Sequence, residues 1–231
     1  MKIALIGTGN MGEMVAVLAR RRGHEITASV DELQRDLGAT ELASFLSGNE
    51  VAIDFSGARA VERNVEACMI AGVPLVEGTT GWNDQLDEVR TAVERYNGAL
   101  VYGANFSIGV NLFYRVTEFA AEIFSRFPEY EVFIEEQHHS RKKDAPSGTA
   151  LKLEMIVSQQ VQREISISST RAGNIPGTHR VGFDGPADQV LLEHTARSRE
   201  GFAAGSIRAA EWIVNKKGFF EFGEVMDEIL S

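Results

Sequence analysis

The sequence predicts an α/β fold, in which an N-terminal Rossmann-type domain with a doubly wound parallel sheet precedes a C-terminal α+β domain. Three observations support this prediction. From Lys2 to Tyr102, apolar runs of strand length alternate with amphipathic segments of helical period. A glycine-rich loop joins the first run to the first helical segment. After Tyr102 the alternation stops, and long helical segments are combined with β-like runs that are separated by turn residues.

The strands expected in the first part are apolar throughout, which is typical of a parallel sheet that helices cover on both faces. These strands span 3–6, 26–30, 51–55, 75–76 and 100–102. The helices expected between them span 11–22, 58–71 and 84–96. Gly23, Gly72 and Gly98 follow these helices, at the position where a residue with positive φ commonly ends a helix. The stretch between Asp31 and Val51 is short, and no helix is assigned to it.

The second part is expected to combine two helices with a mostly antiparallel sheet. The helices span 109–126 and 149–162, and the β-like runs span 130–137, 165–170, 179–184 and 189–196. A helix over 203–216 and an apolar segment over 218–229 are expected to return to the first domain. No Pro- or Ser-rich linker separates the two parts, so the boundary near Ser107 is expected to be a hinge.

The charge balance limits the classes of ligand. The chain has 231 residues, with 23 Lys and Arg against 33 Asp and Glu, and so a net charge of −10. This balance argues against nucleic acid as a partner, because phosphate binding depends on clustered Lys and Arg. An anionic ligand must therefore be bound by a local cationic site.

The remaining composition favours a cytoplasmic protein. The single cysteine, Cys68, excludes a disulfide framework and a zinc site of several thiolates. No long apolar segment precedes the glycine loop, so a signal peptide is not expected. The most apolar stretch, 108–127, carries four charged side chains and is not expected to cross a membrane.

The segment Gly7-Thr8-Gly9-Asn10-Met11-Gly12 fits the G-x-G-x-x-G pattern between a strand and a helix. The first glycine allows a tight turn, the second lets the backbone approach a pyrophosphate, and the third lets the helix pack on the strand. Asp31 ends the second expected strand, where an acid accepts hydrogen bonds from a ribose hydroxyl. The alternative is a tight turn without a ligand, but the strand, the helix and the acid together favour dinucleotide binding.

The residues after Asp31 bear on the choice between NADH and NADPH. Glu32 follows Asp31, where an arginine would hold the 2′-phosphate of NADPH, and this favours NADH. Arg35 is near enough to keep NADPH as an alternative.

The segment 137–150 is the most informative part of the chain. Two of the five histidines, His138 and His139, and three consecutive cations precede a helix start of the type Pro146-Ser147-Gly148-Thr149. The free amides of such a helix start bind a carboxylate. Beside Lys142 they would form a pocket for a small dicarboxylate, and a histidine there transfers protons near neutral pH.

Three alternatives are open for this segment. A solvated basic turn would hold the histidines by chance. A metal site is disfavoured, because adjacent histidines on a strand face opposite sides and no third ligand is evident, so no metal is expected. A nucleic-acid patch lacks interleaved aromatic residues.

With Glu136, this segment resembles the E-x-H-H-x-x-K-x-D-A-P-S-G-T-A signature of the dihydrodipicolinate reductase family, enzymes of the diaminopimelate route to lysine. Other motifs along nearly the whole chain are similar to those of the family. They are EGTTGW at 77–82, ANFSIGVN at 104–111, RAG at 171–173, PGTH at 176–179, and Ser198-Arg199 with Phe202-Ala203.

The resemblance implies a reduction of a cyclic imine dicarboxylate by hydride from NADH or NADPH, with loss of water from the hydroxylated substrate, 4-hydroxy-tetrahydrodipicolinate. His138 matches the acid/base residue and Lys142 the proton donor. The substrate-binding residues that it implies are His139, Ser147, Gly148, Thr149 and Thr80. The cofactor-binding residues are the glycine loop, Asp31, and two loops around the nicotinamide, Gly78-Thr79-Thr80 and Gly103-Ala104-Asn105-Phe106.

The expected domains are a dinucleotide-binding domain over 1–106, completed by 200–231, and a substrate-binding and oligomerisation domain over 107–199. The resemblance also implies a homotetramer. Two alternatives stay open: another small Rossmann reductase of amino-acid metabolism, and a regulator that senses NADH without turnover.

Overall fold

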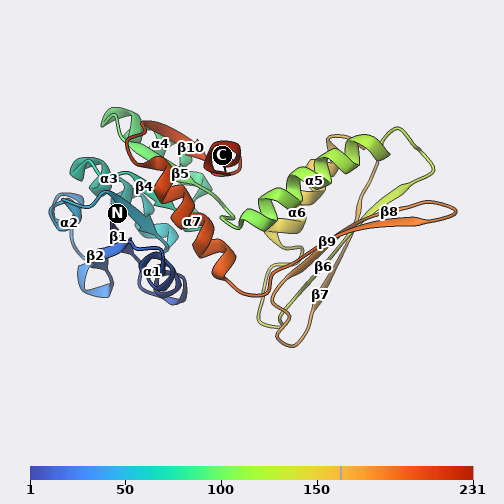
Figure 1. Cartoon of the computed structure of the whole chain (residues 1–231), viewed down its shortest axis with the longest axis horizontal. Coiled ribbons are helices and arrows are strands. Elements are labelled where there is room, and N and C mark those ends of the chain that lie inside the picture. Colours follow the sequence, from blue (N-terminus) through green and yellow to red (C-terminus); the bar gives the residue numbers. More distant parts are fainter. Residues whose placement is uncertain (162, 231) are drawn as a thin grey trace. The chain divides into compact units, whose positions relative to one another are not determined.

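The computed structural model describes residues 1–161 and 163–230, and the chain divides into two compact units (Figure 1). Unit 1 comprises Met1–Ile108 and Arg199–Ser231, and unit 2 comprises Gly109–Ser198. Each unit has its own sheet and its own hydrophobic core. The predicted fold class, a parallel-sheet α/β domain with a second α+β domain, is confirmed.

Unit 1 contains a six-stranded sheet in the order β10-β5-β4-β3-β1-β2, in which all neighbouring strands run parallel. The strands are β1 (Lys2–Ile6), β2 (Glu25–Val30), β3 (Val51–Asp54), β4 (Leu75–Glu77), β5 (Ala99–Tyr102) and β10 (Gly218–Glu221). The chain order switches direction at β1, which has β2 on one side and β3 on the other. In open sheets, ligands bind at such a switch point, beyond the carboxyl ends of the strands.

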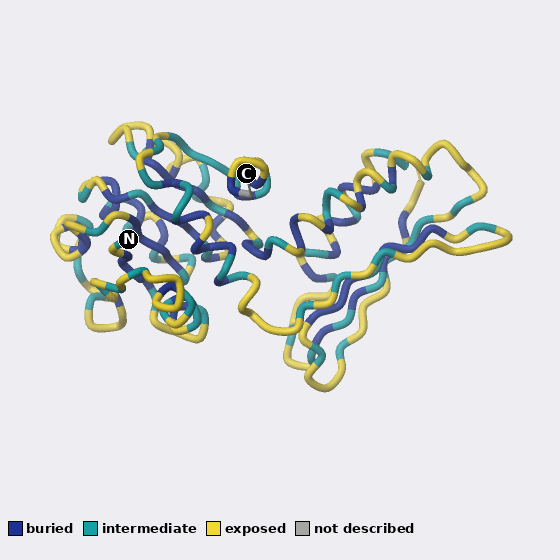
Figure 2. Tube along the Cα trace, viewed as in Figure 1, coloured by how far each residue is buried: buried dark blue, intermediate teal, exposed yellow. Residues whose placement is uncertain are grey.

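Helices cover both faces of this sheet. They are α1 (Asn10–Arg21), α2 (Ala39–Leu46), α3 (Val61–Ala71), α4 (Leu86–Arg95), α7 (Glu200–Ile213) and α8 (Met226–Leu230). Ile3 and Leu5 pack with residues of α1 and α7, whereas Ala4 and Ile6 pack with residues of α2, α3 and α4. Because both faces are covered, β1, β3, β4 and β5 are almost entirely buried (Figure 2), which explains their unbroken apolar sequences.

Unit 1 differs from the predicted elements at three places. The stretch between Asp31 and Val51, for which no helix was predicted, contains α2, and the apolar tail forms β10 and α8. A positive φ was predicted for Gly98, but Gly98 does not have one. The residue before it, Asn97, has a φ of +47°. Gly98 is required for packing instead, because a Cβ on it would lie 2.1 Å from Sδ of Met69.

Unit 2 contains a four-stranded sheet in the order β7-β6-β8-β9. The strands are β6 (Glu131–His138), β7 (Ser166–Arg171), β8 (Thr178–Asp184) and β9 (Gln189–Thr195). Strand β6 runs parallel to β7 and antiparallel to β8, and β9 is antiparallel to β8. Helices α5 (Ile108–Phe124) and α6 (Gly148–Ser158) contribute to the core with the sheet. The helix predicted over 149–162 ends early, and its last predicted residue, Gln162, lies outside the described residues, as does Ser231.

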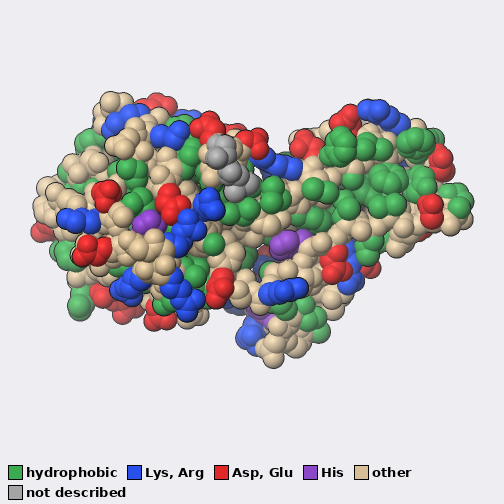
Figure 3. Space-filling view, viewed as in Figure 1, with side chains coloured by type: hydrophobic (Ala, Val, Ile, Leu, Met, Phe, Trp, Pro, Cys, Tyr) green, Lys and Arg blue, Asp and Glu red, His purple; other side chains and the backbone are tan. Residues whose placement is uncertain are grey.

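Helix α5 is strongly two-sided. Phe113, Thr117 and Ala121 are buried, while Val116 and Phe119 are among a row of exposed apolar side chains. Hydrophobic side chains gather over this part of unit 2 in Figure 3. None of the helices in the described part of the chain has the length and apolar character needed to cross a membrane.

Candidate active site

The glycine loop joins β1 to α1 through glycines that have no room for a side chain. Gly7 has a φ of +88°, and a Cβ on it would lie 2.6 Å from the carbonyl oxygen of Phe55. A Cβ on Gly12 would lie 2.0 Å from the carbonyl oxygen of Gly7. The first and third glycines therefore permit the turn and the close packing of α1 on β1, as the pattern predicts.

The middle of the glycine loop is open. A Cβ on Gly9 would meet no atom within 4 Å, and Thr8, Gly9 and Asn10 are exposed, whereas Met11 is half-buried. Gly9 precedes α1 without a side-chain hydrogen bond to the first turn. The N–H groups of that turn are available to a ligand, which is the arrangement that binds a pyrophosphate at a helix N-terminus.

Asp31 follows β2 at the carboxyl edge of the same sheet. Its Oδ1 accepts a 2.8 Å hydrogen bond from the N–H of Leu33, and its own N–H donates to Oε1 of Gln34 at 3.0 Å. These bonds fix a short turn that begins at Glu32. The Asp31 side chain is held in place and exposed.

Two further predicted loops leave this edge after β4 and β5. In the first, Thr79 is buried and Thr80 is exposed. Gly78 lies against the ring of Phe55, where a Cβ would come within 2.2 Å of Cε1. The ring of Phe55 also meets Phe106 of the second loop edge to face, with centroids 6.4 Å apart. Phe55 therefore contacts both loops.

The second loop, Gly103–Phe106, alternates in exposure. Gly103 and Phe106 are buried, Asn105 is half-buried, and Ala104 is exposed. Oδ1 of Asn105 accepts a 2.9 Å hydrogen bond from the N–H of Ser107, which closes the turn after β5.

Two buried carboxyl groups lie beneath the first of these loops. Asp54 and Glu77 end β3 and β4, are directly paired across the two strands, and are fully buried. Oε1 of Glu77 accepts a 2.7 Å hydrogen bond from the N–H of Thr79. Burial, and then the charge of Asp54, raise the pKa of Glu77 well above its ordinary value. We infer that Glu77 is the member of the pair that keeps its proton.

In unit 2, the predicted helix start between Pro146 and Thr149 is confirmed. Ser147 caps α6, because its Oγ accepts a 3.2 Å hydrogen bond from the N–H of Ala150. Gly148 is exposed and Thr149 is half-buried in the first turn. The first amides of a helix lack acceptors within that helix, so this end of α6 can bind a carboxylate.

His138 ends β6 and is 9 % exposed. Its Nδ1 forms an ion pair with Oε2 of Glu136, which lies two residues earlier and therefore on the same face of the strand. The pKa of His138 is lowered: burial lowers it most, the Glu136 carboxylate opposes this, and the charges of Lys142 and Arg171 lower it further.

His179 comes from β8 and faces the same cluster. Its ring meets that of His138 edge to face, with centroids 5.0 Å apart, and its Nε2 lies 3.0 Å from Oγ of Ser147. Burial, and then the neighbouring His138, lower the pKa of His179 to about 4. His179 is therefore neutral near pH 7 and connects the helix cap to the strand.

The cations of the segment lie at its rim. Lys142 is partly exposed, and its Nζ lies 2.9 Å from Oδ1 of Asp144. Arg141 donates a 3.1 Å hydrogen bond to Oδ1 of Asn174, and His139 is half-buried. Lys142 is close enough to both His138 and His179 to lower the pKa of each, so these groups share one electrostatic environment.

The fold supplies a third possible metal ligand that the sequence did not reveal. Glu136, His138 and His179 each offer one ligand atom, and these atoms lie within 4.8 Å of one another. However, both Glu136 oxygens already have partners, the guanidinium of Arg171 at Oε1 and Nδ1 of His138 at Oε2. We therefore interpret this cluster as a hydrogen-bonded and ion-paired network.

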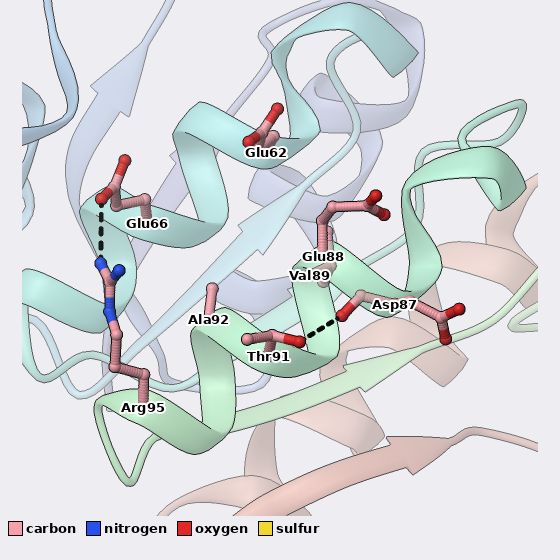
Figure 4. A pocket seen from close by; sticks show the side chains of 8 residues that line it. All are labelled: Glu62, Glu66, Asp87, Glu88, Val89, Thr91, Ala92 and Arg95. Carbon is pink, nitrogen blue, oxygen red and sulfur yellow. Dashed lines mark hydrogen bonds and ion pairs between the residues drawn. The ribbon is translucent and has the colours of Figure 1, made fainter.

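A separate hollow lies between α3 and α4 of unit 1 (Figure 4). Its lining includes four carboxylates, Glu62, Glu66, Asp87 and Glu88, against the single cation Arg95. That charge is opposite to what a pyrophosphate or a dicarboxylate requires. This hollow is therefore no candidate for either ligand.

No site role was predicted for Glu136 or Arg171 of the unit 2 cluster, whereas His179 was noted as part of a family motif. Glu136 was noted only as part of the family signature, although its spacing from His138 places both on one face. Arg171 and His179 join the cluster through strand pairing with β6. In unit 1, the side chain of His24 is 12% exposed, and its Nε2 lies 2.8 Å from Oε1 of Glu211.

A Rossmann-type unit with an open glycine loop, in one chain with a second α+β unit that carries a histidine cluster, is typical of oxidoreductases that use a pyridine nucleotide. Family models agree along the chain: residues 1–106 match the model described as "Dihydrodipicolinate reductase, N-terminus" and residues 109–226 the one described as "Dihydrodipicolinate reductase, C-terminus". The chain belongs to the dihydrodipicolinate reductase family.

Individual relatives agree with this assignment. Proteins named 4-hydroxy-tetrahydrodipicolinate reductase from Christiangramia forsetii and Archaeoglobus fulgidus are 36% and 35% identical, and each alignment covers 100% of both chains. The fold is similar to that of a dipicolinate-bound dihydrodipicolinate reductase from Paenisporosarcina sp. TG-14, with a TM-score of 0.77, 23% identity, and coverage of 96% of this chain and 97% of that one.

Proposed function

We propose that the protein reduces 4-hydroxy-tetrahydrodipicolinate to tetrahydrodipicolinate with NAD(P)H, as a step of lysine biosynthesis through diaminopimelate. The observation that carries the proposal is the junction of His138, whose Nδ1 contacts Glu136, with the amino end of α6 through Glu136 and Ser147. This junction offers a proton-transfer group beside a carboxylate site, which is what a cyclic dicarboxylate needs.

On the cofactor side, we assign the pyrophosphate to the glycine loop, Gly7–Gly12, and the adenosine ribose to Asp31. The nicotinamide half is assigned to Gly78–Thr80 and Gly103–Phe106. The open position at Gly9 and the exposure of Asp31 and Thr80 support these assignments. The bound nicotinamide supplies the hydride, and the protein supplies orientation and charge.

On the substrate side, Ser147, Gly148 and Thr149 would bind one carboxylate of the substrate through backbone amides and a hydroxyl. His139 and Thr80 are assigned as further substrate contacts. His138 and Lys142 would supply protons, His138 through its ring and Lys142 through its Nζ. After the hydroxylated substrate loses water, reduction adds one hydride and one proton to the ring, so a positioned acid is required.

For the cofactor, we favour NADH. Asp31 and Glu32 place two carboxylates at the start of one turn, where the 2′-phosphate of NADPH would be repelled. Measuring kcat/KM for NADH and NADPH side by side tests this preference. A Glu32→Arg variant is expected to gain activity with NADPH relative to NADH, and an unchanged ratio would contradict the role of Glu32.

A homotetramer and a cytoplasmic location remain part of the proposal. Unit 2 is the proposed oligomerisation domain, and exposed Val190 and Leu191 on β9 support a contact through its sheet. Sedimentation equilibrium of the purified protein measures the oligomeric state.

The experiment that tests the function is substrate-dependent oxidation of NAD(P)H, with 4-hydroxy-tetrahydrodipicolinate generated enzymatically in the same vessel. Turnover that requires this substrate supports the proposal. NADH binding without any such turnover would contradict it and would favour a nucleotide-sensing regulator.

A further inference from the structure

Unit 2 contains one carboxylate whose role neither the family signature nor the proposed reaction explains. Glu136 lies inside β6 and is 1 % exposed, so its charge is removed from solvent. Burial of a carboxylate costs free energy unless its oxygens have hydrogen-bond or charged partners. The partners of Glu136 therefore indicate what it does.

Both oxygens of this carboxylate are engaged. Oε2 forms the ion pair with Nδ1 of His138. Oε1 accepts a 2.6 Å hydrogen bond from Nη2 of Arg171 and a 3.3 Å hydrogen bond from the backbone N–H of Ser147. Hydrogen bonds from Arg171 and Ser169, with the charge of His138, outweigh burial and hold the pKa of Glu136 at about 2. The group is therefore a carboxylate at any pH at which the protein would work.

These contacts connect two parts of the candidate site, the end of β6 and the start of α6. His138 ends β6, whereas Ser147 caps α6 and presents the amides proposed to bind a substrate carboxylate. Glu136 contacts both, and His179 connects them a second time through Oγ of Ser147. The position of the histidine relative to the helix end is thus fixed by side chains that are themselves buried.

The other nitrogen of His138 is left clear. A Cβ on Gly177 would lie 3.2 Å from Nε2 of His138, and Gly177 has a φ of +132° that favours glycine. The absence of a side chain there keeps Nε2 uncrowded. An imidazole whose Nδ1 faces a carboxylate carries its proton on Nδ1 when neutral, and exchanges a further proton through Nε2.

We propose that Glu136 is a positioning residue for the reductase reaction: it fixes the Nδ1–H tautomer and the ring orientation of His138, and aligns the amino end of α6 with that ring through Ser147. This inference rests on the proposed function of His138. The catalytic contact with the substrate is assigned to Nε2 of His138, and Glu136 acts only through it.

The first test is a Glu136→Gln variant, which keeps the size of the side chain but not its charge. We expect kcat to fall by about 10- to 100-fold, because an amide no longer selects the tautomer. The Kd for NADH is expected to stay unchanged, and the limb of the pH–kcat profile that reports His138 is expected to move. A Glu136→Asp variant retains the charge and is expected to recover part of the lost kcat.

Glu135→Gln is the matched control. Glu135 lies on the same strand but on the opposite face, where it forms a 3.5 Å ion pair with Arg180. We expect this variant to keep the kcat and the pH profile of the wild type. A Glu136→Gln variant that also kept both would overturn the proposal.

A second measurement does not depend on the variants folding or on the substrate. Nitrogen-15 NMR of histidine-labelled wild-type protein distinguishes the two neutral tautomers. We expect the His138 signal to report a proton on Nδ1, and a proton on Nε2 instead would overturn the proposal. Since no turnover is needed, this result is separate from the fate of the proposed reaction itself.

Discussion

Nη2 of Arg171 donates a 2.6 Å hydrogen bond to Oε1 of Glu136, so that a guanidinium from β7 neutralises a buried carboxylate on the neighbouring β6. Removing the guanidinium would leave that carboxylate buried with one partner fewer. We predict that Arg171→Met destabilises the protein by about 3–5 kcal/mol, the range found when one member of a buried pair is removed. Urea unfolding measures this loss.

The control for Arg171 is Arg180→Met. Arg180 forms exposed ion pairs with Glu193 and Glu135 on the other face of the sheet. Solvent screens exposed pairs, so they contribute little to stability, and this variant should unfold almost as the wild type does. If Arg171→Met and Arg180→Met lowered the free energy of unfolding equally, the pair of Arg171 with Glu136 would not contribute as a buried pair does.

The buried pair of Asp54 and Glu77 predicts a pH dependence of stability in unit 1. The pKa of Glu77 is raised in the folded state, so the folded state holds a proton that the unfolded state releases. Stability contributed by this proton is present below the ordinary glutamate pKa and declines as pH rises from there towards the raised value. Glu77→Gln cannot ionise, and its unfolding free energy should decline less steeply over that range.

Urea unfolding across a pH series measures how the free energy of unfolding changes with pH in the wild type and in Glu77→Gln. Asp87→Asn, on the surface of α4, provides a control that should keep the wild-type slope. Identical slopes for Glu77→Gln and the wild type would contradict the assignment of the retained proton to Glu77.

The glycine loop gives a prediction that separates folding from binding. A Cβ on Gly12 would lie 2.0 Å from the carbonyl oxygen of Gly7, so Gly12→Ala should cost about 1–3 kcal/mol of stability. A Cβ on Gly9 meets nothing within 4 Å, so Gly9→Ala should fold normally and still weaken NADH binding where the pyrophosphate is proposed to lie. Thermal unfolding and fluorescence titration with NADH measure the two effects. Normal NADH affinity in Gly9→Ala would place the pyrophosphate elsewhere.

The proposed proton donors predict a loss of turnover without a loss of cofactor binding. His138→Ala or Lys142→Ala should lower kcat by about 10²–10⁴-fold, the usual contribution of a positioned acid or base. The Kd for NADH should stay near the wild-type value in each. Steady-state kinetics and NADH titration make the comparison, and full turnover by either variant would remove that residue from its proposed role.

The parts of the fold that depend on local pattern could be predicted from the sequence. The glycine loop, the buried parallel strands and the start of α6 are each encoded within a few consecutive residues, and all are present. Helix α2 was missed because eight residues, Ala39–Leu46, are too short for the helical period to stand out from a loop. Strand β10 pairs with β5, and nothing in its four residues indicates which strand it will join.

The candidate site, too, has one part that local sequence predicts and another part that depends on strand pairing. His138, Lys142 and Ser147 lie in one continuous segment, and their residue types predict an acid/base and anion-binding role. Arg171 and His179 are brought to Glu136 only by the register of β7 and β8 against β6. Such long-range pairing is not visible in one sequence, so the network behind His138 required the structure.

The most direct test of the central claim is to follow the hydride itself. The protein would be incubated with enzymatically generated 4-hydroxy-tetrahydrodipicolinate and with NADH carrying deuterium at the transferable position of the nicotinamide ring. The account predicts one deuterium in the tetrahydrodipicolinate, detected by mass spectrometry, and a greatly slowed transfer with His138→Ala. NADH oxidation that leaves the dicarboxylate product without deuterium would contradict it.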